Sequence, residues 1–146
     1  MKLRFIFLGK KNSSLVDKGI ADYRVRLNKY INSECIFIDE KNENKLSQKL
    51  FKQIKPRDCV FVLDECGTCF STLKYAQLIK KKMANYSSII FVVGSAYGIP
   101  QRIIQKAHLV ISLSSMTFPH MIARLLLIEQ TYRVFCILNN HPYHHE

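Results

Sequence analysis

Short apolar runs alternate along the chain with segments in which apolar residues recur at helical spacing. The strand-like runs contain almost no polar residues and lie at 3–8, 35–38, 59–63, 89–93 and 109–113. The helix-like segments carry Lys and Arg between their apolar positions and lie at 14–30, 46–54, 72–83, 100–107 and 120–138. Strands that alternate with helices predict an α/β fold with a mainly parallel sheet. Because runs such as 59–63 have no polar side, we expect helices on both faces of the sheet.

The length and composition predict a single cytoplasmic domain over residues 1–146. A chain of 146 residues with 48% hydrophobic residues is long enough for one core and too short for two. Its longest apolar runs are far shorter than a membrane-spanning helix, and its first ten residues do not resemble a secretory signal. The five cysteines are odd in number, which favours reduced thiols and a reducing compartment.

The charge of the chain predicts an anionic partner. Lys and Arg number 22 against 11 Asp and Glu, which gives a formal net charge of +11. Such an excess is typical of proteins that bind nucleic acid or an anionic membrane surface.

Three segments that follow predicted strands are candidates for a ligand site, because open α/β sheets bind ligands beyond the carboxyl ends of their strands. They follow Leu63, Val93 and Leu113. The turn 94–98 has a glycine at each end, which suits either a tight turn or a close approach of the backbone to a ligand. It matches neither the dinucleotide fingerprint nor the P-loop.

The loop 114–120 combines hydroxyls, a thioether, an aromatic ring and a proline. Backbone donors beside apolar walls suit a flat, uncharged group such as adenine. In the alternative interpretation, Met116 and Phe118 pack into the core beside the last helix. His120 is placed either to cap that helix or to contact a ligand.

Three further features suggest other properties. The helix 120–138 is apolar on more than one side, which predicts a homodimer. Cys66 and Cys69 form a CxxC pair between a predicted strand and helix, which leaves a redox role as an alternative. Three of the five histidines lie in the tail, but no partner ligands accompany them, and no metal site is predicted.

The C-terminal motifs resemble one family. The run Ser-Ser-Met-Thr-Phe-Pro-His at 114–120, the residues Arg124, Ile128-Glu129-Gln130 and Tyr132-Arg133, and the ending His-Pro-Tyr-His at 141–144 are similar to the SPOUT-class ribosomal RNA large-subunit methyltransferase H family. The resemblance extends over the whole chain. It implies S-adenosylmethionine as cofactor, methylation of N3 of a pseudouridine in large-subunit (23S) ribosomal RNA, a homodimer and a C-terminal trefoil knot.

The resemblance also implies the cofactor residues, which are Leu63, Gly94, Leu113, Ser114, Ser115, Met116, Thr117 and Phe118. The chain departs from the family in its glycine turn. Ser95 replaces a second glycine, and Tyr97 stands where an acidic residue is common.

For catalysis we expect positioning of the reactants to dominate, with help for the proton that leaves N3. Tyr143 and His144 in the tail are candidates to reach the base, and Arg124 is a candidate to stabilise its anion. The alternatives are a tail that only packs and an Arg124 that forms an ordinary ion pair. Since the short chain has no RNA-binding appendage, we expect the assembled ribosome as substrate and an RNA site built from both chains of a dimer.

Overall fold

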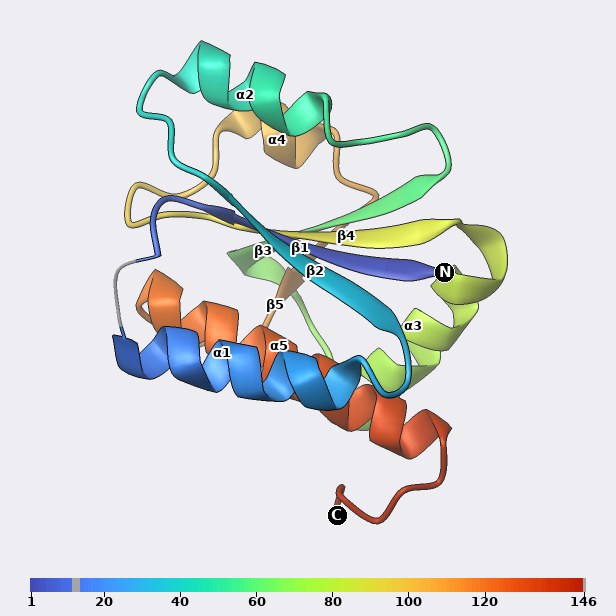
Figure 1. Ribbon diagram of the computed structural model, residues 1–146. Helices are drawn as coiled ribbons and strands as arrows, with labels where there is room; N and C mark the ends of the chain where they lie inside the picture. The colour runs from blue at the N-terminus through green and yellow to red at the C-terminus, as the bar shows by residue number, and fades with distance from the viewer. Residues whose placement is uncertain (12–13, 146) are drawn as a thin grey trace.

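The computed structural model describes residues 1–11 and 14–145 (Figure 1). Within them, parallel strands form one sheet in the order β2-β1-β4-β3-β5. The strands are β1 (Lys2–Leu8), β2 (Asn32–Ile38), β3 (Asp58–Cys69), β4 (Ser88–Val93) and β5 (Leu109–Ser112). The helices are α1 (Ser14–Leu27), α2 (Glu43–Phe51), α3 (Thr72–Asn85), α4 (Gln101–Gln105) and α5 (His120–Leu138). The predicted α/β fold with a parallel sheet is confirmed.

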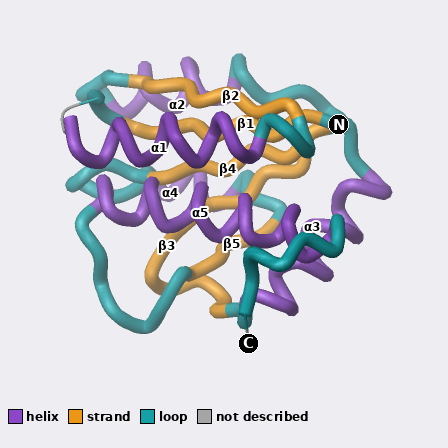
Figure 2. Tube along the Cα trace, turned by 60° about the horizontal axis from the view of Figure 1, so that its bottom comes forward, coloured by secondary structure: helices purple, strands orange, loops and turns teal. Residues whose placement is uncertain are grey.

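Helices cover both faces of the sheet, as the apolar strands predicted (Figures 1 and 2). Along β1, Phe5 and Phe7 point into a core shared with α1, α3 and α5, whereas Ile6 and Leu8 point into a second core with α2 and α4. Successive side chains of a strand point to opposite faces, so both faces need apolar residues.

The third strand is longer than the pattern predicted. β3 continues to Cys69, and both Leu63 and Thr68 pair with Ile111 of β5. Residues 64–67 therefore bulge out of the ladder between these two pairings. The prediction that Cys66 and Cys69 lie between a strand and a helix was wrong, because both belong to β3.

Gly67 allows the bulge to lie against β5. A Cβ atom at this position would be 2.7 Å from the carbonyl carbon of Ile111 and 2.8 Å from its nitrogen. Backbone atoms cannot turn away as side chains do, so any larger residue must push the two strands apart.

We expect Gly67→Ala to destabilise the protein by about 2 kcal/mol, the usual cost of overpacking. Urea unfolding followed by circular dichroism measures this change. The matched control is Thr68→Ala, which alters an exposed neighbour in the same strand and should change the free energy of unfolding by less than about 0.5 kcal/mol. Equal stabilities of the two variants would contradict the close packing of Gly67 on β5.

The last helix begins and ends as predicted, and it packs between α1 and α3 (Figure 2). Neighbours within the chain thus cover more of its apolar surface than the sequence suggested, although Ile122 keeps 38% of its surface exposed. The homodimer therefore stays a prediction. Among the described residues, no helix is long and apolar enough to cross a membrane.

Candidate functional site

The three candidate segments meet in one cleft at the carboxyl edge of the sheet. The cleft has a volume of about 260 Å³ and lies between the bulge of β3, the turn after β4 and the loop after β5. Seven of the eight predicted cofactor residues line it, and Ser115 does not. The predicted residues that line it are Leu63, Gly94, Leu113, Ser114, Met116, Thr117 and Phe118. Ser95, Ala96 and Gly98 of the candidate turn and His120 of the candidate loop line it as well. The sequence did not point to the remaining lining residues, which are Asp64, Glu65, Val93, Ile99, Ser112 and Ala123.

The loop after β5 is fixed by its own hydroxyl groups. Ser112 Oγ donates to the carbonyl of Ser114 at 2.7 Å, and Ser114 Oγ accepts from the nitrogen of Met116 at 3.0 Å. Thr117 Oγ1 donates to Glu65 Oε2 at 2.6 Å, which fastens the loop to the bulge of β3. Met116 is 71% exposed, so the interpretation that it packs into the core was wrong.

Phe118 forms a wall shared by two hollows. The half-buried ring lines the cleft and also a second hollow of about 370 Å³ between α3 and α5. Leu113 likewise lines both the cleft and the second hollow. The loop thus gives the cleft an apolar side, which suits the flat face of a ring.

The turn 94–98 is both a tight turn and a wall of the cleft. The nitrogen of Gly98 donates to the carbonyl of Ser95 at 2.9 Å, and Gly98 has a φ of 81°. A Cβ at Gly94 would be 2.9 Å from the carbonyl oxygen of Gly98. Gly94 is therefore required first by the turn itself, and the closed turn then brings its backbone to the cleft.

Two carboxylates also line the cleft. Asp64 and Glu65 lie in the bulge of β3 and line the cleft, and Asp64 Oδ1 accepts from the nitrogen of Cys66 at 2.9 Å. A ligand with a positive charge would be stabilised beside them. A signal was present in the sequence, since Asp64 directly follows the apolar run 59–63 that was predicted as a buried strand.

His120 adds a nitrogen base to the same cleft. Partial burial lowers the pKa of its imidazole, and the nearby positive charge of Arg124 lowers it further. Both effects disfavour the protonated ring. At neutral pH the side chain is therefore a neutral imidazole that can accept a hydrogen bond or a proton.

Arg124 does not line the cleft, so its expected contact with the base does not fit the described chain. The side chain is 1% exposed, and its guanidinium donates to the carbonyls of Lys10 at 2.9 Å and Leu8 at 3.0 Å. It also stacks over Phe7 at 5.2 Å. Among the described residues it has no carboxylate partner within 4.0 Å, so an ordinary ion pair does not fit either. Arg124 therefore holds the segment that follows β1 in position.

The tail folds back along the second half of α5 (Figure 2). Tyr143 donates its hydroxyl to Glu129 Oε1 at 3.0 Å, and Arg133 stacks over the Tyr143 ring at 4.8 Å. Nη1 of Arg133 lies 3.3 Å from Nδ1 of His144. Burial, helped by hydrogen bonds with Tyr23 and Glu129, raises the pKa of Tyr143, so its hydroxyl keeps its proton at neutral pH.

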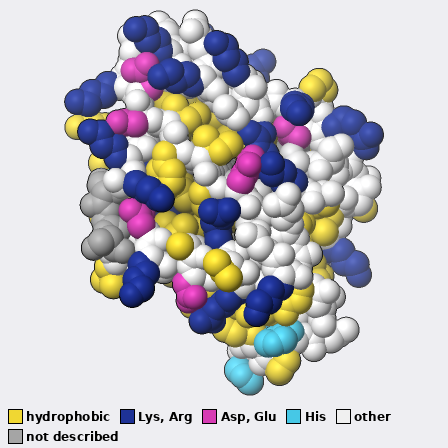
Figure 3. Space-filling model, in the orientation of Figure 1, with side chains coloured by type: hydrophobic (Ala, Val, Ile, Leu, Met, Phe, Trp, Pro, Cys, Tyr) yellow, Lys and Arg dark blue, Asp and Glu magenta, His cyan; other side chains and the backbone are white. Residues whose placement is uncertain are grey.

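The position of the tail on α5 is remote from the cleft of the same chain. Ala123 lines the cleft, whereas Glu129 and Arg133 hold the tail six and ten residues further along α5. At a rise of 1.5 Å per residue, these positions lie roughly 9 and 15 Å along the helix. Histidine side chains lie at this end of the molecule beside basic ones (Figure 3). In the described chain the tail therefore packs on its own helix, as the alternative interpretation allowed.

The cysteine pair lacks the surroundings of a redox site. Cys66 and Cys69 are free and exposed in an extended strand, not at the helix N-terminus that stabilises a thiolate. Within residues 1–11 and 14–145, no group of three or more His, Cys, Asp or Glu side chains is placed to hold a metal ion.

Comparison with known proteins gives a full-length match. The family model described as "Predicted SPOUT methyltransferase" matches residues 1–144. The chain is 38% identical over 157 aligned residues to "Ribosomal RNA large subunit methyltransferase H" of Parabacteroides distasonis, with 100% of both chains covered. It is 35% identical over 156 residues to the protein of that name from Trichlorobacter lovleyi, with 99% of this chain and 100% of the relative covered.

Two solved structures share the fold. A probable methyltransferase from Bordetella pertussis Tohama I gives a TM-score of 0.61 at 12% identity, covering 91% of this chain and 93% of that one. A probable methylase family protein from Haemophilus influenzae Rd KW20 gives a TM-score of 0.59 at 14% identity, covering 99% of this chain and 70% of that one. At such low identity these likenesses concern the fold alone.

Proposed function

The chain belongs to the SPOUT methyltransferase family, and we propose that it transfers a methyl group from S-adenosylmethionine to N3 of a pseudouridine in 23S ribosomal RNA. The full-length relatives named as ribosomal RNA methyltransferases support the reaction class and the RNA substrate. The observation that carries the proposal is the meeting of three strand-end segments in one cleft. We propose that residues 1–146 form one such catalytic domain, working in the cytoplasm where ribosomes are.

The residues of the cleft fit S-adenosylmethionine. Leu113 and Phe118 offer apolar contact for adenine, and the backbone of the same loop offers hydrogen bonds to its edge. The carboxylates of Asp64 and Glu65 line the same cleft and favour a cationic ligand. The bound cofactor supplies a sulfonium methyl group that is already activated for transfer.

The protein then has to orient the base, exclude water and assist the loss of the N3 proton. His120, neutral and inside the cleft, is one acceptor for this proton. Tyr143 and His144 can contact the base only from a second copy, because the tail lies away from the cleft of its own chain. We therefore propose a homodimer in which each cleft is completed by the other chain's tail.

We propose the assembled ribosome, or its large subunit, as the substrate. The net charge of +11 favours binding to RNA, and basic side chains are spread over the face shown in Figure 3. A cleft on so small a chain offers little area for recognising RNA sequence, so the surrounding ribosome supplies the remaining contacts.

Two measurements test this function together. Isothermal titration with S-adenosylhomocysteine should give saturable binding, and radiolabelled S-adenosylmethionine should label 23S RNA in ribosomes that lack this methyl group. Ribosomes in which the target is still uridine are the matched control and should accept far less label. Equal labelling of both kinds of ribosome would contradict the pseudouridine target, and absence of both binding and labelling would contradict the enzyme.

A further inference from the structure

Tyr97 is an aromatic side chain in open solvent at the rim of the cleft. It is 97% exposed, more than any other large apolar residue in the described part of the chain. Its neighbours Ala96 and Gly98 both line the cleft. Single exposed apolar residues are common, so exposure alone assigns no role. Tyr97 is of interest because it lies between two residues that line the cleft.

The backbone beneath Tyr97 is fixed. Its nitrogen donates to Ser95 Oγ at 3.2 Å, and Ser95 and Gly98 form a β-bridge that closes the turn. β4, which precedes the turn, is buried along its whole length. The ring therefore extends from a rigid support without packing on the core, as a binding side chain does.

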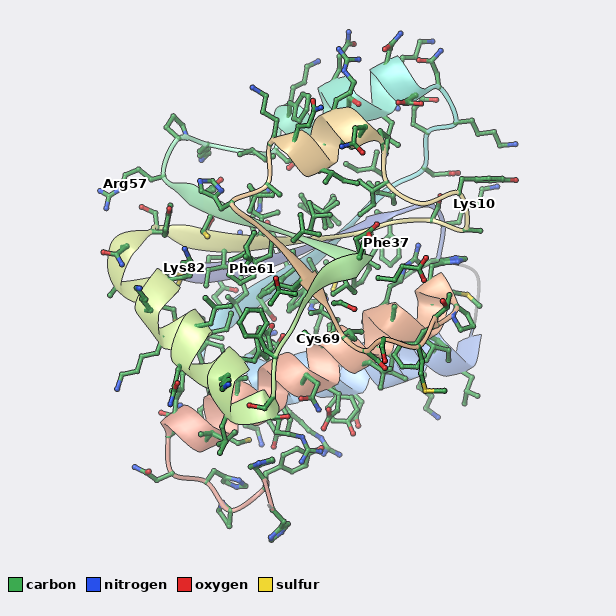
Figure 4. All side chains as sticks on the ribbon, turned by 180° about the vertical axis from the view of Figure 1, so that it is seen from behind. Lys10, Phe37, Arg57, Phe61, Cys69 and Lys82 are labelled. Atoms are coloured by element: carbon green, nitrogen blue, oxygen red, sulfur yellow. The ribbon has the colours of Figure 1, made fainter. Side chains whose placement is uncertain are left out.

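Basic side chains stand next to this turn. A Cβ atom at Gly9 would be 3.6 Å from Cβ of Ser95, so the segment after β1 lies against the turn. Lys10 follows directly and is 69% exposed, and Lys11 lies 5.8 Å above the ring of Phe37. Figure 4 shows Lys10 and Phe37 at the sheet edge where the loop after β4 also lies. Arg124 fixes this segment by holding the carbonyls of Leu8 and Lys10.

The approach to the turn and the cleft itself therefore differ in charge. Lys10 and Lys11 follow β1 beside the turn and lie outside the cleft, with Lys10 Nζ 3.9 Å from Asp39 Oδ2, whereas Asp64 and Glu65 line the cleft on the side of β3. Phosphates are attracted to the two lysines and repelled by the two carboxylates of the cleft. A lysine-lined path with an exposed aromatic ring is the pattern by which proteins bind single-stranded nucleic acid.

We propose that Tyr97 stacks on a nucleobase next to the target nucleotide, while Lys10 and Lys11 hold the adjoining phosphates. The RNA then enters the cleft over the ends of β1 and β4 and not over the bulge of β3. This inference rests on the proposed function and specifies the path of its substrate.

The test compares Tyr97→Ala with Tyr97→Phe in the full chain. Stacking of a base on an aromatic ring is worth enough that Tyr97→Ala should raise KM for ribosomes about 10-fold. Tyr97→Phe keeps the ring and should stay within about twofold of the unaltered protein. Affinity for S-adenosylhomocysteine should be unchanged in both variants, because Tyr97 is exposed to solvent and does not line the cleft.

Each other outcome overturns the inference in a recognisable way. A matching loss of S-adenosylhomocysteine affinity in Tyr97→Ala would make the ring a cofactor contact. A change in sedimentation to a smaller species would make it a contact between copies of the chain. An unaltered KM would remove any role, while activity of the unaltered protein would still support the methyltransferase.

The lysines are tested through salt. Each phosphate contact on a single strand contributes about 0.7 to the slope of log affinity against log salt. The double variant Lys10→Ala, Lys11→Ala should therefore reduce that slope for ribosomes by about 1.4. The double variant Lys80→Ala, Lys81→Ala, at two exposed positions on α3, is the matched control and should leave the slope unchanged. Equal effects of both variants would indicate a diffuse charge effect and overturn the proposed path.

Discussion

Deletion of residues 141–146 is expected to lower methyl transfer by about 100-fold or more, the usual contribution of a general acid or base. Affinity for S-adenosylhomocysteine should change by less than about threefold. The reason is the separation of the tail from the cleft along α5, which leaves the cofactor walls intact when the tail is removed. Radiolabel transfer to ribosomes and isothermal titration measure the two quantities.

Stability must be checked because Tyr143 packs on Tyr132 with ring centroids 4.8 Å apart. Loss of this contact should lower the free energy of unfolding by about 1 kcal/mol, which leaves the protein folded. Tyr143→Phe is the matched variant, since it keeps the ring and removes only the hydroxyl. Methyl transfer by the truncated chain at the full rate would contradict any role of the tail in the reaction.

Mixed dimers distinguish a tail that acts on its own cleft from one that acts on its partner's. Chains without the tail are mixed with chains that have an intact tail and the Gly94→Val cleft. If each tail completes the other chain's cleft, mixed dimers contain one complete site and recover activity that neither parent shows. Recovery is impossible if cleft and tail must belong to one chain.

The pH profile of His144→Ala separates proton transfer from positioning. If His144 helps N3 lose its proton, the defect in turnover should shrink as rising pH ionises the base without help. A defect that is constant with pH assigns His144 to positioning. The same profile for His120→Asn tests the neutral imidazole within the cleft.

The fold was predictable because it depends on patterns that a sequence carries directly. The alternation of Phe5 and Phe7 with Ile6 and Leu8 fills two cores, and a run apolar on both sides indicates a strand covered on both faces. The bulge of β3 was not predictable, because residues 64–67 are mostly polar and their place depends on β5, more than forty residues away. The trefoil knot rests on the family resemblance and stays a prediction.

The position of the cleft was predictable from the sequence, but the contacts of nearby residues such as Arg124 were not. Topology alone selects the segments after Leu63, Val93 and Leu113, since parallel strands end at one edge. The burial of Arg124 was not predictable, because an arginine is expected at a surface or in an ion pair. Its burial over Phe7 and its bonds to two carbonyls depend on the path of β1, which periodicity does not specify.

Gly94→Val should abolish measurable binding of S-adenosylhomocysteine, with a loss in affinity of at least about 100-fold. The added Cβ would lie 2.8 Å from Cγ1 of Ile99, a side chain that can move, and 2.9 Å from the carbonyl carbon of Gly98, which cannot move without the turn. The turn must therefore shift, and it carries Ser95, Ala96 and Gly98, which all line the cleft. The cost in stability should be about 1–3 kcal/mol, the range for overpacking.

Tyr97→Ala is the matched control, because it alters the same turn on its solvent side and should leave cofactor affinity unchanged. Circular dichroism and urea unfolding should show that Gly94→Val remains folded, because the turn lies at the edge of the sheet and outside both cores. In a folded variant, the lost affinity then comes from the altered wall of the cleft. Full affinity in folded Gly94→Val would place the methyl donor elsewhere, and the second hollow beside Phe118 would become the site to test.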